Sequence, residues 1–138
     1  KTVRARGDGY VCQVAAQVLG GSITLDDDYT NVAVGLEYNP LIEPNSVHVA
    51  TQSGSTLYVK KRIVRAFVDY YQSLGIYIND NLIPYQEFGD ELDTPPTLKD
   101  GVFEYNNLSD WLIRESATIT QKDPLPMTIL GIGYEVDV

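Results

Sequence analysis

Hydrophobic and polar residues alternate along much of this chain, a pattern typical of β-strands that bury one face. The stretch "YVCQVAAQVLG" at 10–20 places Tyr10, Cys12 and further apolar residues on one parity and two glutamines on the other. The stretch "NVAVGLEY" at 31–38 alternates in the same way. Its apolar parity consists of Val32, Val34, Leu36 and Tyr38. We predict a half-buried strand in each stretch.

Shorter elements surround these two strands. "SITL" at 22–25 predicts a short strand and "DDDY" at 26–29 a turn. "NPLIEPN" at 39–45 contains two prolines, which remove backbone donors and favour a loop or an edge strand. The segment 46–59 predicts two short strands about the turn "QSGS".

The segment "KKRIVRAFVDYYQSLGIYIN" at 60–79 fits two patterns. Apolar residues at helical spacing, with Gly75 as a C-cap, favour a helix, whereas the parity of Val64, Ala66, Val68 and Tyr70 favours a strand. Because β-branched and aromatic residues dominate and no N-cap residue precedes the segment, we predict a strand.

Beyond this segment, positions 80–99 are polar, acidic and proline-bearing, which predicts a long loop with at most one short strand. Strands are expected at 100–106, at 115–121 and from Pro124 to Val138. The last strand places Leu130, Ile132, Tyr134, Val136 and Val138 on one face. Gly131 and Gly133 lie on the other, where a backbone or a large ring has room to approach.

About eight short strands separated by turns predict an all-β fold, either an antiparallel β-sandwich or an open barrel with a long acidic loop. A chain of 138 residues is long enough to bury a core, so we expect one β domain over 1–138. No apolar run approaches the length of a membrane span.

Charge and cysteine content narrow the function classes. The net charge of −9, from 19 acidic and 10 basic residues, argues against a sequence-reading DNA-binding protein. Cys12 is the single cysteine, so the chain can form neither an internal disulfide nor a thiolate zinc cluster. Its place on an apolar parity indicates a small buried hydrophobe.

Candidate chemistry is sparse, and no catalytic, cofactor or metal residue is assigned. Asp26, Asp27 and Asp28 lack the spacing of a calcium loop and are interpreted as a turn. The acids Glu87, Asp90, Glu91 and Asp93 would suit a glycosidase, but acids crowded in a loop are more often solvated. His48 is interpreted as a structural histidine.

Five residues are candidates for a protein interface. They are Lys60, Lys61, Arg62, Arg65 and Trp111. The four cations form the most concentrated positive charge of the chain and would pair with acidic residues of a neighbouring chain or loop. Tryptophan is enriched in interfaces and equally serves in cores.

Three segments resemble one family. They are "VAVGLEYNPLIEP", "KKRIVRAFVDYYQSLGIYIN" and "ITQKDPLPMTILGIGYEVDV". In this order they are similar to the tail tubular protein B, or nozzle, proteins of short-tailed bacteriophages, also called phage stabilisation proteins. The third is the most specific, through Gln121, Asp123, Pro124, Leu125, Pro126, Thr128 and Leu130. The resemblance covers roughly 30–138; the segment before Asn31 and the loop 80–99 have no counterpart in the family pattern.

The resemblance implies a structural subunit of a homo-oligomeric ring in the virion, made in the cytoplasm of the bacterial host. It implies tail adaptor and fibre proteins as partners and DNA passing through without sequence-specific binding. Family members are several-fold longer, so this chain, which begins without methionine, is expected to be a C-terminal part. Two alternatives remain: a capsular-polysaccharide hydrolase or glycan-binding tail domain, and a β-sandwich binding module unrelated to phage.

Overall fold

The computed structural model describes residues 2–12, 18, 20–52, 54–106, 110–114 and 116–138. Within these ranges twelve strands and no helix are present, which confirms the all-β fold class. The strands are β1 Val3–Gly7, β2 Tyr10–Cys12, β3 Val32–Leu36, β4 Leu41–Ile42, β5 Ala50–Thr51, β6 Gly54–Ser55, β7 Arg62–Ser73, β8 Ile76–Ile78, β9 Asn81–Leu82, β10 Lys99–Asn106, β11 Ile119–Gln121 and β12 Ile129–Asp137. The described ranges therefore contain no helix able to cross a membrane.

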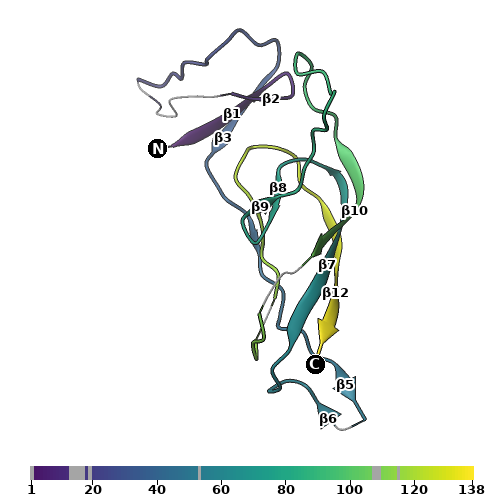
Figure 1. Cartoon of the computed structure of the whole chain (residues 1–138). Helices are drawn as coiled ribbons and strands as arrows, with labels where there is room; N and C mark the ends of the chain where they lie inside the picture. Colours follow the sequence, from purple (N-terminus) through teal and green to yellow (C-terminus); the bar gives the residue numbers. More distant parts are fainter. Residues whose placement is uncertain (1, 13–17, 19, 53, 107–109, 115) are drawn as a thin grey trace.

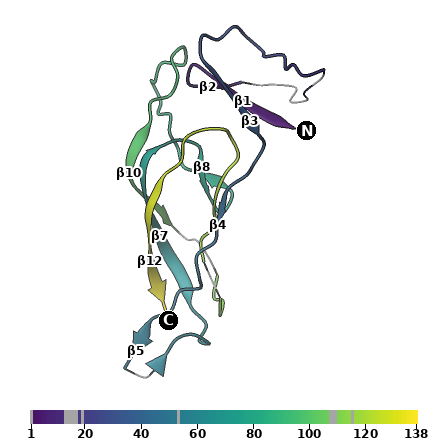
Figure 2. The same ribbon diagram turned by 180° about the vertical axis from the view of Figure 1, so that it is seen from behind.

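The strands form three antiparallel sheets and one small hairpin (Figures 1 and 2). Strand order is β2-β1-β3 in the N-terminal sheet, β10-β7-β12 in the long sheet and β4-β11-β8-β9 in the short sheet. β5 pairs with β6. The N-terminal sheet lies at one end of the molecule and the β5–β6 hairpin at the other. Each sheet has open edges, so the arrangement is of the sandwich type and not a closed barrel.

The core lies between the long sheet and the short sheet. It consists of the buried residues Ala66, Val68, Ile76, Ile78, Ile83, Ala117 and Ile119. Phe103 of β10 and Ile132 and Tyr134 of β12 pack against this cluster. Each large aliphatic side chain buried here contributes about 1.5–3 kcal/mol to stability. The two sheets are therefore held together mainly by apolar packing.

The segment 60–79 forms strands, as predicted, and the helical alternative is wrong. β7 is the central strand of the long sheet and pairs with both β10 and β12. Gly75, with φ of 66°, turns the chain from β7 into β8 instead of ending a helix. The β-branched and aromatic residues of β7 suit a pleated surface with two neighbours.

Register shifts decide which residues of β12 face the core. They occur between Ile129 and Gly131 and between Glu135 and Val136. As a result Ile129 packs toward the core, whereas Leu130 is 62% exposed. The prediction that Leu130 shares the buried face with Ile132 is wrong, because an extra residue in one strand moves the side chain to the opposite face.

The glycine face of β12 agrees better with its prediction. A Cβ at Gly133 would lie 3.9 Å from the ring of Phe67, so a large ring does approach the strand there. At Gly131 the same position is open. Val138, expected on the apolar face, follows the end of β12 and is exposed.

The largest disagreement concerns β3. The pattern predicts that Val32, Val34 and Leu36 are half buried, but they are 41%, 50% and 65% exposed. β3 is an edge strand that pairs only with β1, and no other described element covers its apolar parity. Alternation correctly indicates a strand here, but it does not show that the same chain buries the apolar face.

Other predicted strands are shorter than expected or absent. Of the strand expected at 10–20, β2 covers Tyr10–Cys12, and 13–17 and 19 lie outside the described residues. The strand expected at 22–25 is absent. Gly20 and Gly21, both at positive φ, turn the chain just before it. The expected edge segment contains β4, and the long loop contains β9, both as predicted.

Candidate functional site

Lys61, one of the five predicted interface residues, is buried. Its side chain is 0% exposed, and Nζ donates to the carbonyl oxygen of Thr56 at 3.0 Å. Its backbone pairs in both directions with Leu112, next to Trp111. Lys61 is therefore not exposed in the single chain, and its part in an interface stays a prediction. Its place in a cationic run did not reveal that the backbone bridge draws it inward.

Arg65 is already engaged within the chain. It lies on the outer face of the long sheet, 3.1 Å from Glu104 of β10 and 2.6 Å from Glu135 of β12. The hydrogen bond that Arg65 donates to Glu104 and the charges of both carboxylates raise the pKa of Arg65. The three side chains cross-link the strands of the sheet, and the charge of Arg65 is balanced locally.

Lys60 and Trp111 remain on the surface, and Arg62 is half buried. Trp111 is followed by two further exposed apolar residues, Leu112 and Ile113. The bridge between Lys61 and Leu112 holds this apolar run beside the start of β7. An interface at Lys60 and Trp111 stays a prediction.

Acidic residues of the loop between β9 and β10 stabilise its turns through a hydrogen bond and an ion pair. The carboxylate of Asp90 accepts the amide of Glu87 at 2.8 Å, and Glu87 lies 3.6 Å from Lys99. Asp90 and Glu91 line a small pocket of about 160 Å³ beside Lys99. The loop is thus built partly by its own carboxylates.

The other candidates have local partners. Asp26 and Asp27 lie in the bend predicted there, and Asp26 accepts the hydroxyl of Tyr29 at 3.1 Å. His48 Nε2 lies 2.7 Å from Ser55 Oγ at the surface, and Cys12 is buried in another sheet, as its parity predicts. No group of three histidine, cysteine or acidic residues is arranged for a metal within the described ranges.

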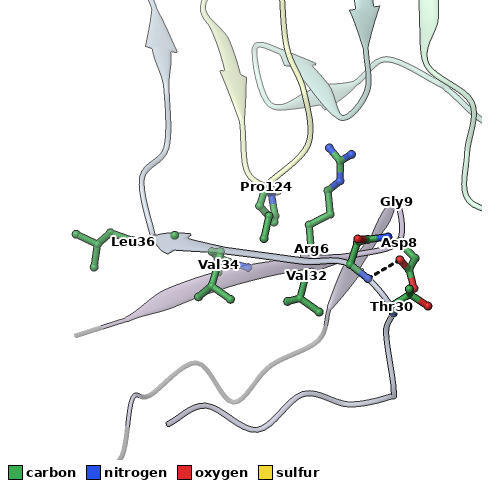
Figure 3. Close-up of a pocket in the computed structure, with 12 residues that line it drawn as sticks. Arg6, Asp8, Gly9, Thr30, Val32, Val34, Leu36 and Pro124 are labelled. Atoms are coloured by element: carbon green, nitrogen blue, oxygen red, sulfur yellow. Dashed lines mark hydrogen bonds between the residues drawn. The ribbon is translucent and has the colours of Figure 1, made fainter. Parts of the chain in front are cut away.

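The N-terminal sheet carries a wide groove. The turn Asp8-Gly9, with φ of 49° and 96°, joins β1 to β2 as a two-residue hairpin. In register, Arg4 lies opposite Gly35 and Arg6 opposite Ala33, so these four residues share one face. With Pro124 they line a groove of about 1020 Å³ (Figure 3).

Three charged residues line this groove: Arg4, Arg6 and Asp8. Two of them, Arg4 and Asp8, have hydrogen-bond partners within the chain. Arg4 donates to Glu37 at 2.7 Å, and Asp8 accepts the amides of Thr30 and Asn31 at 2.7 and 2.9 Å. Those two backbone hydrogen bonds lower the pKa of Asp8, so it stays ionised. Arg6 extends away from the sheet on the side where Pro124 lies (Figure 3) and makes no hydrogen bond or ion pair with any described residue.

The sequence contained signals for this groove that the first pattern missed. "VRARGDGY" alternates from Val3, and Asp-Gly between two such runs is a strong hairpin signal. The hairpin places both arginines on one face because they are two positions apart. What no pattern could supply is the return of Pro124, more than a hundred positions later, to the opposite wall.

Comparison with known proteins adds no relative. No protein-family model matches the chain, and no curated protein matches it. The groove and the remaining interface residues therefore stand on their geometry alone.

Proposed function

We propose that this chain is a non-enzymatic structural subunit of a bacteriophage tail nozzle, part of a homo-oligomeric ring through which DNA leaves the virion. The proposal joins the resemblance of three segments to two properties of the fold. The three segments contact one another, and the N-terminal sheet exposes an apolar edge. Adaptor and fibre proteins of the tail would be its partners.

Two of the three segments meet at the turn between β7 and β8. Gln121 is buried, and its Nε2 donates to the carbonyl oxygen of Leu74 at 2.8 Å. The amide of Leu74 donates to the carbonyl oxygen of Pro126 at 3.0 Å. Leu125 lies over Gly75, with Cδ1 only 3.1 Å from the position of a Cβ there. The Gln-x-Asp-Pro-Leu-Pro motif therefore holds the Leu-Gly turn in place, and we call this set of contacts the clasp.

The first segment joins the same unit. It contains β4, whose Ile42 pairs with Ile119 of β11, and Ile119 pairs in turn with Ile78 of β8. Residues 119 and 78 belong to the third and second segments. Contacts among all three support the interpretation that they resemble the family as parts of a single fold and not as scattered matches.

The observation that carries the structural role is the uncovered edge of β3. This strand has one neighbour, and its apolar side chains Val34 and Leu36 are at least half exposed. Proteins that act alone protect such edges, because they pair with other chains. An edge of this kind suits a subunit whose neighbour covers it.

The charge of the chain suits a DNA conduit. A net charge of −9 repels phosphate, so a passage lined by such subunits would not retain DNA. The exposed acids of the loop between β9 and β10 add to this field.

Electron microscopy of the virion tests the proposal. We expect the sequence to fit density in a ring around the axis at the tail tip, with β12 traceable in the long sheet. Density that places the chain away from the conduit, or a virion that lacks it, would contradict the proposal. Immunogold labelling with an antibody against the exposed loop provides an independent position.

A glycan-degrading or glycan-binding tail module is the second candidate. The observation favouring it is the small pocket lined by Asp90 and Glu91 together with Tyr85. Purified capsular polysaccharide should then be cleaved or bound, and Glu87→Gln or Asp90→Asn should abolish this. Unchanged polysaccharide chain length and no measurable binding would remove this candidate.

A further inference from the structure

The loop between β9 and β10 carries a knob that its own chain does not cover. Phe88 is fully exposed, and Leu92, four positions later, is 76% exposed. Four acids stand beside them: Glu87, Asp90, Glu91 and Asp93. We call residues 87–93 the knob. Aromatic residues presented in this way are the usual anchors of protein interfaces.

The knob is held in shape before any partner arrives. The amide of Glu87 donates to Asp90 within it, and the carbonyl oxygen of Asp93 accepts the hydroxyl of Tyr10 at 2.7 Å. The first bond closes the knob on itself, and the second ties its end at Asp93 to β2. Ordering on binding would therefore cost less than it does for a free loop.

The groove on the N-terminal sheet offers the knob an open floor and one cation, Arg6, that has no partner among the described residues. Its floor between the two arginines consists of Ala33 and Gly35, and a Cβ at Gly35 meets no atom within 4 Å. This space suits an aromatic ring, which guanidinium groups contact favourably. Arg6 is without a partner among the described residues, so it can receive a carboxylate.

We propose that the groove receives the knob of a second copy of this chain, with Phe88 over Ala33 and Gly35 and Glu91 paired with Arg6. The knob does not occupy its own groove, because Phe88 is fully exposed in the single chain. Each copy thus offers one knob and one groove, and repetition of this contact can build a closed assembly. The inference rests on the proposed ring and names its contact.

Charge reversal tests the contact. In sedimentation of the full chain at concentrations up to about 1 mM, the wild type should self-associate. Arg6→Glu or Glu91→Arg alone should weaken association at least about tenfold, because like charges would face each other. An equimolar mixture of the two variants should restore it, since every knob then meets a groove of opposite charge.

Packing variants test the position of the ring. Phe88→Ala should weaken association, and Gly35→Val should do so by filling the floor of the groove. Valine suits a strand, and Gly35 does not adopt a positive φ, so folding should be kept. Tyr58→Ala is the matched control, because Tyr58 is an exposed aromatic residue outside the groove and the knob. Circular dichroism checks that each variant folds.

Two results overturn the inference: a wild type that stays monomeric, or association that none of the knob and groove variants changes. Neither result depends on where the virion carries the chain. If microscopy finds no ring but the mixed variants associate, the contact stands and the nozzle proposal fails. If microscopy finds the ring with another contact, the nozzle proposal stands and this inference fails.

Discussion

At the scale of single residues, glycine at position 7 fixes how the segment before β3 lies on the N-terminal sheet. A Cβ at Gly7 would overlap the ring of Tyr29, which therefore lies directly against the backbone of β1. Partial burial and the hydrogen bond to Asp26 raise the pKa of Tyr29, so the hydroxyl stays protonated as a donor. One missing side chain thus allows the ring to pack directly on the backbone of Gly7.

Gly7→Ala should lower the free energy of unfolding by about 1–3 kcal/mol, because an added methyl group in a filled site displaces its neighbours. Urea titration followed by fluorescence measures this change. Gly35→Ala is the matched control, since a Cβ there meets no atom. It should change stability by less than about 0.5 kcal/mol. Equal losses in both variants would contradict the packing of Tyr29 on Gly7.

The hydrogen bonds to the carboxylate of Asp8 predict that the stability of the fold depends on pH. The amides of Thr30 and Asn31 lower its folded-state pKa below the ordinary 3.8. Its contribution to stability is therefore present above the unfolded pKa and is lost as pH falls through the folded pKa. Asp8→Asn keeps a residue that tolerates the positive φ but removes the charge. The variant should melt below the wild type at neutral pH.

The gap in melting temperature should shrink as the pH falls through 3.8 and should close below the folded-state pKa, where the wild-type carboxylate has taken up its proton. Asp137→Asn is the control, because the Asp137 carboxylate has no hydrogen bond or ion pair in the described part of the chain. Its melting curve should follow the wild type throughout. If the difference in melting temperature between Asp8→Asn and the wild type stays constant in acid, the hydrogen bonds from the two amides do not stabilise the fold through the charge of Asp8.

At the scale of elements, the clasp between Gln121 and the β7–β8 turn predicts a measurable loss. Gln121→Ala removes the donor for the carbonyl oxygen of Leu74 in a buried place, which should lower the free energy of unfolding by about 1–3 kcal/mol. Lys122→Ala, next to it and half exposed beside Asp80, should cost less than about 1 kcal/mol. Similar losses at both positions, measured by urea unfolding, would argue against the clasp.

The elements also show how far a pattern predicts a fold. β7 was predictable because its β-branched and aromatic residues suit a strand with two neighbours. The bulge near Ile129 was not, since register depends on the partner strand. The exposure of Val34 was equally hidden, because alternation does not say which chain covers a face. The burial of Lys61 was hidden as well, because it depends on a backbone bridge to Leu112.

The groove was also only partly predictable from the sequence: one wall follows from the local pattern, and the other does not. Its arginines follow from the alternation at the start of the chain, and the Asp8-Gly9 hairpin explains their common face. Pro124 reaches the other wall from the loop between β11 and β12, which the hydrogen bond of Gln121 to Leu74 holds against the β7–β8 turn. The local alternation of residues predicts the strands. It does not predict the contacts between distant segments that assemble a site, because such contacts leave no periodic pattern in the sequence.

At the scale of the whole molecule, charge and open edges act together. The net charge of −9 keeps free chains apart over long distances, while the local pairing of an acidic knob with an arginine groove acts at contact. Self-association by this contact should therefore strengthen as salt screens the general repulsion, up to the point where the ion pair itself is screened. A subunit of this kind remains dispersed until neighbours are brought close.

The same field predicts that the chain does not hold DNA. Fluorescence anisotropy of a labelled duplex at about 50 mM salt should show no binding up to about 100 μM protein, because phosphate contacts supply most non-specific affinity. Among the described residues, Arg4, Arg65, Lys99 and Lys122 already pair with carboxylates. A variant with lysine at Glu87, Asp90, Glu91 and Asp93 is the control. It places a basic cluster on an exposed loop and should bind, with an affinity that falls as salt rises. Micromolar binding by the wild type would contradict a conduit subunit, since a surface that retains DNA would slow its passage.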